Sequence, residues 1–191
     1  MLSLKRRAAG VVLGSLLALG GTAAVPAAAV TDAPQAPAKK LCLGGHRIDN
    51  AFIYRRWQQL GGSDGAMGCP VNDNFTLPNG AERQTFEHGQ LAWSPDQGHR
   101  MVVAAWQSGG YAYFTWGPTD PYHYDTFLVR YTSAANPFGT QKELGKGNQG
   151  GMWVQRRTTG SYKFIVEGCD VGGSGHTCRQ GWTTSVRTYP Y

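Results

Sequence analysis

The chain lacks the short motifs that mark several common catalytic centres, and it has little charge. It contains no P-loop and no His-Glu-x-x-His zinc motif, and only 16% of its 191 residues are charged. These motifs build a phosphate-binding loop or supply a pair of metal ligands, so their absence excludes those forms of nucleotide enzyme and metalloprotease. We expect a non-catalytic protein that needs no cofactor.

Dense positive charge is absent as well. The net charge is +6, but three of the 18 basic residues, Lys5, Arg6 and Arg7, lie at the extreme N-terminus. The rest of the chain therefore has a net charge of only +3, and beyond pairs such as Arg55-Arg56 its basic residues are dispersed. Because nucleic-acid binding needs a basic stripe or patch, we expect no nucleic-acid partner.

The N-terminus has the organisation of a secretory signal peptide. The three basic residues precede an apolar stretch of small residues, and Ala27-x-Ala29 offers a cleavage site. We predict a signal peptide at residues 1–29, which implies export, and a disordered Pro- and Ala-rich linker at residues 30–40. The alternative is a membrane anchor, since the apolar stretch is nearly long enough to span a bilayer. The cleavage signature favours the signal peptide, so we expect no membrane contact after processing.

Cysteine is present in a small, even number. The four residues are Cys42, Cys69, Cys169 and Cys178. In an exported chain an even count indicates disulfides, and local pairing, Cys42–Cys69 and Cys169–Cys178, is the simplest connectivity. A zinc site built on Cys169, His176 and Cys178 is the alternative, but the chain lacks the Cys-x-x-Cys spacing of structural zinc sites. We therefore expect two disulfides and no metal.

Helical periodicity is confined to one segment, residues 47–62. Asp49 or Asn50 is suited to cap its start, and Gly61-Gly62 is suited to end it. Its apolar residues recur along one helical face, at Ile48, Phe52, Ile53, Trp57 and Leu60.

The remainder of the chain has the pattern of turns and strands. Residues 82–87 and 90–94 predict a hairpin, and longer alternating strands follow a Gly-rich stretch at 107–110. We therefore predict two domains. The first, residues 41–106, is a small α+β module with one helix and β-hairpins, and the second, residues 110–191, is an all-β sandwich.

No group of residues marks a catalytic site. The carboxylates of Glu82 and Glu87 have the chemistry of an acid and a base, but we expect the predicted hairpin to hold them on a solvated face. A small hydrolase is therefore only a third hypothesis. The five histidines are scattered among predicted loops and strand ends without a partner motif: His46, His88, His99, His123 and His176.

Aromatic residues are the remaining chemical resource, at 12% of the chain. Trp and Tyr on a rigid β-surface stack on the apolar faces of sugars, while nearby polar groups bind the hydroxyls. We select Trp93, Tyr54 and Trp106 as candidate ligand contacts, with Glu87 as a polar partner. Core packing is the alternative for each aromatic residue, because large aromatic side chains are mostly buried. Trp57, on the apolar helical face, is assigned to the core, and Trp93 is the preferred ligand contact.

The segment from about residue 45 to 100 resembles a single LGFP repeat. Met67-Gly68-Cys69-Pro70 stands where the family has its naming motif, so Met and Cys replace Leu and Phe. The resemblance implies that a Cys42–Cys69 disulfide replaces an aromatic packing contact. The other matching positions are Leu60-Gly61-Gly62, Gly65, Leu77 to Gly80, Arg83, Phe86, Gly89, Leu91, Trp93, Ser94, Pro95 and Gly98-His99.

The C-terminal part resembles a fibronectin type III domain, an immunoglobulin-like sandwich. The segments 113–118, 125–132 and 162–168 are similar to its B, C and F strands in order. The segment 169–178 would then form an F–G loop closed by the second disulfide.

These resemblances imply extracellular, non-catalytic work. LGFP repeats occur on exported actinobacterial proteins and are associated with the cell envelope. Our first hypothesis is a secreted, wall-associated module that binds cell-wall polysaccharide or peptidoglycan. The second is a secreted protein-binding factor, such as a protease inhibitor or adaptor, that uses the Cys169–Cys178 loop and has another secreted protein as its partner. An exposed line of aromatic residues would favour the first, and a rigid protruding loop the second.

Overall fold

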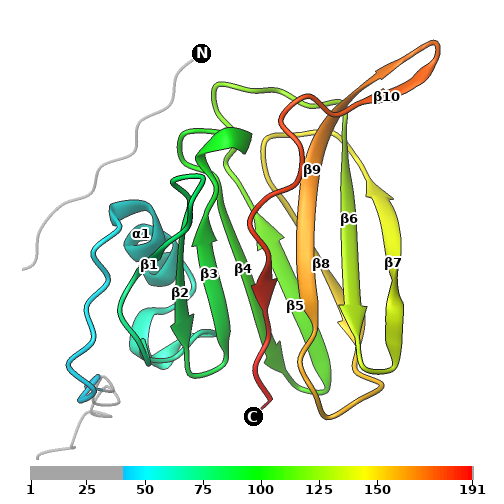
Figure 1. Ribbon diagram of the computed structural model, residues 1–191. Coiled ribbons are helices and arrows are strands. Elements are labelled where there is room, and N and C mark those ends of the chain that lie inside the picture. The colour runs from blue at the N-terminus through cyan, green and yellow to red at the C-terminus, as the bar shows by residue number, and fades with distance from the viewer. Residues whose placement is uncertain (1–40, 191) are drawn as a thin grey trace, which may run out of the picture. The chain divides into compact units, whose positions relative to one another are not determined.

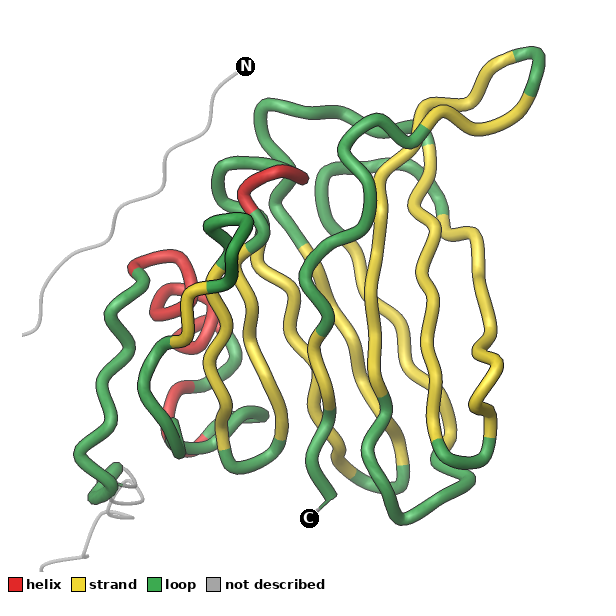
Figure 2. Tube along the Cα trace, in the orientation of Figure 1, coloured by secondary structure: helices red, strands yellow, loops and turns green. Residues whose placement is uncertain are grey.

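The structure, a computed structural model, describes residues 41–190. The predicted signal peptide and linker, residues 1–29 and 30–40, lie outside the described residues. Within the described part, most residues form strands of two antiparallel sheets, and helical turns occur only before β4 (Figure 1, Figure 2). No helix there has the length and apolar character needed to cross a bilayer.

The predicted helix is present as α1 (Ala51–Gln59) and is shorter than the periodic segment. The side-chain oxygen of Asn50 accepts hydrogen bonds from the amides of Phe52 and Ile53, at 2.9 and 3.0 Å, so Asn50 rather than Asp49 is the N-cap. Gly61 follows the helix with a φ of 98°, a left-handed conformation that glycine adopts without steric cost. The short 3₁₀ turn η1 (Gly62–Asp64) comes next.

The first sheet has six strands in the order β1-β2-β3-β4-β5-β8. Its predicted hairpin at residues 82–94 is confirmed as β2 and β3, and the 3₁₀ turn η2 (Pro95–Gln97) leads from β3 to β4. The strands are β1 (Phe75–Thr76), β2 (Glu82–Phe86), β3 (Gly89–Trp93), β4 (Val102–Ser108), β5 (Tyr111–Trp116) and β8 (Gly150–Gln155).

The second sheet has the order β10-β9-β6-β7, and β11 also pairs with β9. The strands are β6 (Thr126–Ser133), β7 (Asn136–Leu144), β9 (Lys163–Gly172), β10 (Gly175–Thr177) and β11 (Val186–Arg187). The amide of Tyr189 donates to the carbonyl of His88 at 3.1 Å, and Thr188 forms a β-bridge with Gly89. The chain end after β11 therefore joins the second sheet to β3 and closes that side of the molecule.

The two faces of β4 pack into different cores. Val103 and Ala105 face the second sheet and share a core with Phe114, Phe127 and other residues of both sheets. Val102 and Ala104 point the other way, into a smaller core under α1 that includes Ile53, Met67, Phe86 and Leu91. The molecule is thus layered as helix, sheet and sheet, with β4 buried on both faces.

The structure differs from the predicted domain division. The described residues, 41–190, belong to one compact unit, and residues 109 and 110 form the tight turn between β4 and β5 of a single sheet. The core between the sheets draws Ala92 and Val103 from before this turn and Phe114 and Phe164 from after it. Because the two predicted domains share strands and a core, no linker separates them.

Both predicted disulfides are confirmed. Cys42 and Cys69 are bonded across a sequence separation of 27 residues, and Cys169 and Cys178 across nine. The first fixes the segment before α1 to the loop before β1, and the second closes the base of the β9–β10 hairpin. Each stabilises the fold mainly by limiting the conformations of the unfolded chain.

Candidate functional site

The preferred ligand contact of the sequence analysis, Trp93, lies beneath α1. Its ring stacks on Phe52 of the helix with centroids 5.5 Å apart and an interplanar angle of 17°. The indole N–H donates to the backbone oxygen of His99 at 2.9 Å. These contacts occupy one ring face and the polar edge of the indole, so they favour the packing role that was the alternative for this residue.

Glu87 and Tyr54 come from different elements, since Glu87 follows β2 and Tyr54 belongs to α1. A carboxylate oxygen of Glu87 accepts a hydrogen bond from the Cys69 amide at 3.0 Å, so this side chain orders the loop that carries the first disulfide. Tyr54 is 43% exposed on α1, where its hydroxyl accepts a hydrogen bond from the side-chain amide nitrogen of Gln58 at 2.9 Å. The three predicted contacts described so far thus have different packing and hydrogen-bond partners.

The fourth predicted contact, Trp106, begins a row of aromatic residues across three neighbouring strands. Trp106 of β4 is paired in register with Tyr113 of β5, which is paired with Trp153 of β8. The rings of Trp106 and Tyr113 stack at 5.3 Å and 9°, and Tyr111 meets Trp153 edge-on at 5.0 Å. We call these four residues the aromatic row.

The aromatic row lies on the outer face of the first sheet. Trp106 packs against the small core under α1, and the other three residues lie on β5 and β8, further from the helix. The helix packs against β3 and β4, so its nine residues leave β5 and β8 without this cover. Trp153 is 61% exposed, whereas Trp106, Tyr111 and Tyr113 are half-buried. The inner residues thus hold one another in place, and Trp153 presents the open surface.

An open cleft adjoins the outer end of this row. It has a volume of about 490 Å³ and lies between β8, the last strand of the first sheet, and the β6–β7 edge of the second. Its walls include Tyr131, Thr140 and Lys142 on one side and Trp153, Gln155 and Arg157 on the other. Trp153 belongs to both features, so the aromatic row leads directly into the cleft.

The shifted carboxylate pKa values lie away from this region. Hydrogen bonds from His176 and Thr126 hold the pKa of Glu143 below its usual range, and burial raises the pKa of Glu167. Burial also raises the pKa of Tyr124, which lies in the core between the sheets. These shifts follow from local burial and hydrogen bonding and do not mark the aromatic row.

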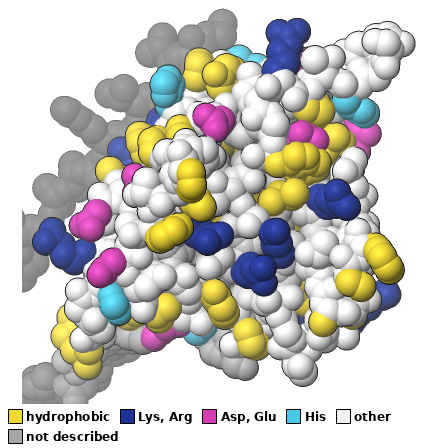
Figure 3. Space-filling view, in the orientation of Figure 1, with side chains coloured by type: hydrophobic (Ala, Val, Ile, Leu, Met, Phe, Trp, Pro, Cys, Tyr) yellow, Lys and Arg dark blue, Asp and Glu magenta, His cyan; other side chains and the backbone are white. Residues whose placement is uncertain are grey.

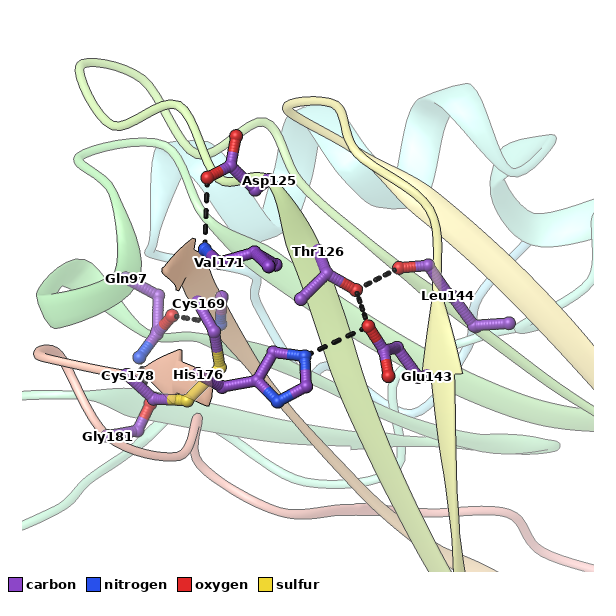
Figure 4. The surroundings of a disulfide bond; sticks show 11 residues. Gln97, Asp125, Thr126, Glu143, Leu144, Cys169, Val171, His176, Cys178 and Gly181 are labelled. Carbon is purple, nitrogen blue, oxygen red and sulfur yellow. Dashed lines mark hydrogen bonds and ion pairs between the residues drawn. A yellow bond between two sulfur atoms is a disulfide. The ribbon is translucent and has the colours of Figure 1, made fainter. Parts of the chain in front are cut away.

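Glu143 instead helps to fix the β9–β10 hairpin, which projects beyond the sheets in Figure 1. His176 of β10 contacts the Glu143 carboxylate at 3.0 Å, and a carboxylate oxygen of Asp125 accepts from the Val171 amide at 3.0 Å (Figure 4). The disulfide joins the two strands at the base. Because Cys169 and Cys178 are bonded to each other, their sulfurs are not free thiolates and the zinc alternative is wrong.

The carboxylates considered for acid–base chemistry are also separated. Glu82 accepts from Asn74 at one end of β2, and Glu87 follows its other end. Five residues of extended strand place the Cα atoms of Glu82 and Glu87 roughly 16 Å apart. This distance is well beyond the spacing between the two carboxyl groups of a glycosidase.

Two glycine strings match catalytic signatures by letter. Residues 61–65 read Gly-x-Ser-x-Gly but follow a helix, and residues 145–150 read Gly-x-Gly-x-x-Gly but connect two strands, β7 and β8. Both signatures need a strand, a turn and then a helix. Neither string has this context.

The comparison with protein families gives one match. Residues 67–117 match the LGFP repeat. The matched residues run from the loop before β1 through β5, so they include Trp106, Tyr111 and Tyr113 of the aromatic row, whereas α1 and Trp153 lie outside. No curated protein and no solved structure matches the chain. The repeat and the two disulfides are consistent with an extracellular or cell-surface protein.

The match also revises the extent of the repeat. We expected it to end near residue 100, yet the matched segment continues through the β4–β5 hairpin. Sequence reasoning selected Trp106 but missed Tyr111, Tyr113 and Trp153. The alternation of residues 111–116 did indicate which aromatic residues share a face, but the sequence does not show which face α1 covers.

Proposed function

We propose that this protein is a non-catalytic, exported module that binds cell-envelope polysaccharide or peptidoglycan through the aromatic row. The observation that carries the proposal is the open ring of Trp153 beside a row of supported aromatic side chains. Trp and Tyr rings bind the apolar faces of sugars by stacking, and their contact area is large for the few torsions that become fixed. The row spans two inter-strand spacings, roughly 10 Å, a length comparable to a disaccharide.

The polar surroundings suit such a ligand. Gln155 is exposed on β8 and paired in register with Tyr111, and Thr115 lies further along β5 on the face of Tyr113. Amide and hydroxyl groups next to the rings supply donors and acceptors for sugar hydroxyls. The stacked pair Trp106–Tyr113 keeps the platform rigid before binding, which lowers the entropic cost of association.

We also infer that the scaffold is a fibronectin type III-like sandwich extended by the repeat. The order β4-β5-β8 in one sheet and β7-β6-β9-β11 in the other is the order of strands A, B, E and C′, C, F, G. The sandwich would then begin at β4, near residue 102, and share β4 and β5 with the LGFP repeat. The repeat's strands β1 to β3 extend the first sheet beyond strand A.

Sedimentation with purified bacterial cell walls, with soluble glycan fragments as competitors, tests the proposed function. We expect the protein to sediment with walls, and Trp153→Ala to lose about fivefold or more of its affinity, as expected for one aromatic contact of about 1 kcal/mol. Phe138→Ala is the matched control, since Phe138 is 91% exposed but lies outside the row. Equal binding by Trp153→Ala and the control would contradict the assignment.

The β9–β10 hairpin favours a second candidate function, recognition of another secreted protein. The hairpin projects from the sheets, is closed by the Cys169–Cys178 disulfide and exposes Val171 to 55% (Figure 1). A rigid projecting loop loses little entropy when it docks on a partner. If replacement of the tip residues 172–175 by Ala abolished wall association while Trp153→Ala did not, the hairpin would be the functional element.

A further inference from the structure

We propose that the cleft beside Trp153 binds an anionic group, a carboxylate or phosphate, on the glycan that stacks on the aromatic row. This inference rests on the proposed function and identifies its ligand as an acidic rather than a neutral glycan. The inference is based on Lys142 and Arg157, the two basic residues that line the cleft. The cleft lining contains no Asp or Glu. Neither cation forms an ion pair with any residue of the range 41–190.

The side chain of Lys142 lies on the inner face of its strand, the face that in a two-sheet fold usually holds apolar residues. Lys142 is paired in register with Val129, a core residue, so its side chain leaves β7 on the face that looks toward the first sheet. That face stays open to water at this point because β8 is the last strand of the first sheet. The ammonium group is therefore placed over the cleft and not on the outer surface.

Arg157 is held on the opposite wall through its backbone. Its amide donates to the hydroxyl of Tyr162 at 2.6 Å, and Tyr162 is only 2% exposed. The hydroxyl already accepts this hydrogen bond, so it retains its own hydrogen for an acceptor in the cleft. Asn136 and Thr140 add further polar groups to the lining. Donors and positive charge thus converge on one space, which is the chemistry that binds carboxylate and phosphate oxygens.

Continuity with the aromatic row connects the cleft to the glycan. Trp153 ends the row and lines the cleft, so a sugar stacked on its ring places its neighbouring substituents at the cleft entrance. Two unpaired cations beside an aromatic platform favour an acidic sugar chain over a neutral one, since a neutral ligand leaves both charges without a partner.

The outer face of the second sheet provides an internal comparison. Figure 3 shows Lys and Arg side chains over this face. Lys163 of β9 and Arg187 of β11 are exposed and paired in register with each other. Their neighbours Phe164 and Val186 point into the core, so the two basic side chains point outward. They match the cleft pair in charge and residue type, but neither lines the cleft or belongs to the aromatic row. If general positive charge were sufficient for binding, the two pairs would contribute equally.

Salt-dependent sedimentation of the whole protein tests the inference. The probes are Gram-positive walls that retain their phosphodiester-linked polymers and the same walls after hydrofluoric acid has removed those polymers. We expect the double variant Lys142→Gln/Arg157→Gln to bind about three- to tenfold more weakly than the wild type at low salt, and to lose less affinity as salt rises. Lys163→Gln/Arg187→Gln should behave as the wild type, and all three proteins should melt alike.

The two wall samples distinguish the sources of the anion. A charge-dependent difference that survives hydrofluoric acid assigns the ligand to peptidoglycan carboxylates, and one that disappears assigns it to polymer phosphates. The inference fails alone if Trp153→Ala loses binding while the cleft and control double variants bind equally at every salt concentration. If the wild type binds neither wall sample, the proposed function and this inference both fail.

Discussion

The two halves of the first sheet's outer face contain similar residues in different surroundings. Over β3 and β4, the helix α1 covers the face, and Trp93 stacks on Phe52. Over β5 and β8 no helix among residues 41–190 provides such cover, and Trp153 is 61% exposed. The nine-residue helix α1 thus decides the role of each tryptophan on this face. Trp93, which α1 covers, is a packing residue, and Trp153, which α1 does not reach, is a surface residue. We call these regions the covered half and the open half.

The two lateral edges of the sandwich differ in the same way. On the β3 side, β11 and the residues after it connect the sheets through backbone hydrogen bonds. On the β8 side, no described strand performs this role, and the cleft opens between β8 and β7. The open half of the face and the open edge meet at Trp153, which is why both proposals converge on this residue.

The largest expected effect tests whether the two halves share one core. Phe114 is fully buried between the sheets and stacks on Phe164 at 5.1 Å, so Phe114→Ala should destabilise the fold by about 3–5 kcal/mol. Urea unfolding followed by tryptophan fluorescence and by circular dichroism should give one coincident transition for the wild type and the variant. Two separate transitions, or stable proteolytic fragments on each side of residues 107–110, would instead support independent domains.

The next largest expected effect is the loss of stability when a disulfide is removed. From the loop lengths, loss of Cys42–Cys69 should cost about 3.5 kcal/mol and loss of Cys169–Cys178 about 2.7 kcal/mol. Paired Cys→Ser variants, compared by calorimetry, measure both values. Loss of the hairpin disulfide should leave wall binding intact, because the hairpin lies outside the aromatic row. A larger effect from the shorter loop would show that native contacts, and not chain entropy, dominate.

A smaller effect separates the covered half from the open half directly. Trp93→Ala removes a half-buried ring and its hydrogen bond to His99, and should cost about 2 kcal/mol. Trp153→Ala removes a mostly exposed ring and should cost less than about 1 kcal/mol. Thermal melts of the two variants decide this point, and equal destabilisation would show that the open half also depends on its aromatic residues for stability.

The smallest effect concerns pH and the hairpin. Hydrogen bonds from His176 and Thr126 lower the pKa of Glu143 in the folded protein, so its contribution to stability is present above the unfolded-state pKa. That contribution should disappear as pH falls through the lower folded-state pKa. The melting difference between wild type and Glu143→Gln should therefore shrink from pH 7 to pH 3. A difference that grew on acidification would mean that the carboxylate is not favoured in the folded state.

Local structure followed from the sequence wherever a pattern was complete. The helix, its termination at Gly61, the β2–β3 hairpin and both disulfides were predicted from periodicity, capping residues and cysteine spacing. The strand β4 was missed, although its unbroken apolar run from Met101 to Trp106 is typical of a strand buried on both faces. The strand β7 gave less signal, because it is a polar edge strand that contains Pro137 and Gly139.

The candidate site was less predictable because it depends on tertiary cover. Trp93 and Trp106 are both strand tryptophans that pack against the small core under α1. Nothing in their local sequence shows that Trp93 stacks on Phe52 of the helix while Trp106 stacks on Tyr113 and begins the aromatic row. Trp153 lies in a strand with weak alternation, and its partnership with Tyr113 exists only through the pairing of β5 with β8. The predicted domain boundary at residues 107–110 also separated β4 from β5, although the two strands are paired and form one continuous surface.

Binding by the two tryptophan variants to the same cell-wall preparation tests the central claim most directly. The measurement is made at a temperature at which thermal melts show the wild type, Trp93→Ala and Trp153→Ala to be fully folded. We predict that Trp93→Ala binds as the wild type does, and that Trp153→Ala loses about fivefold or more of its affinity. Loss of binding by Trp93→Ala with full binding by Trp153→Ala would contradict the assignment of the open half as the ligand surface.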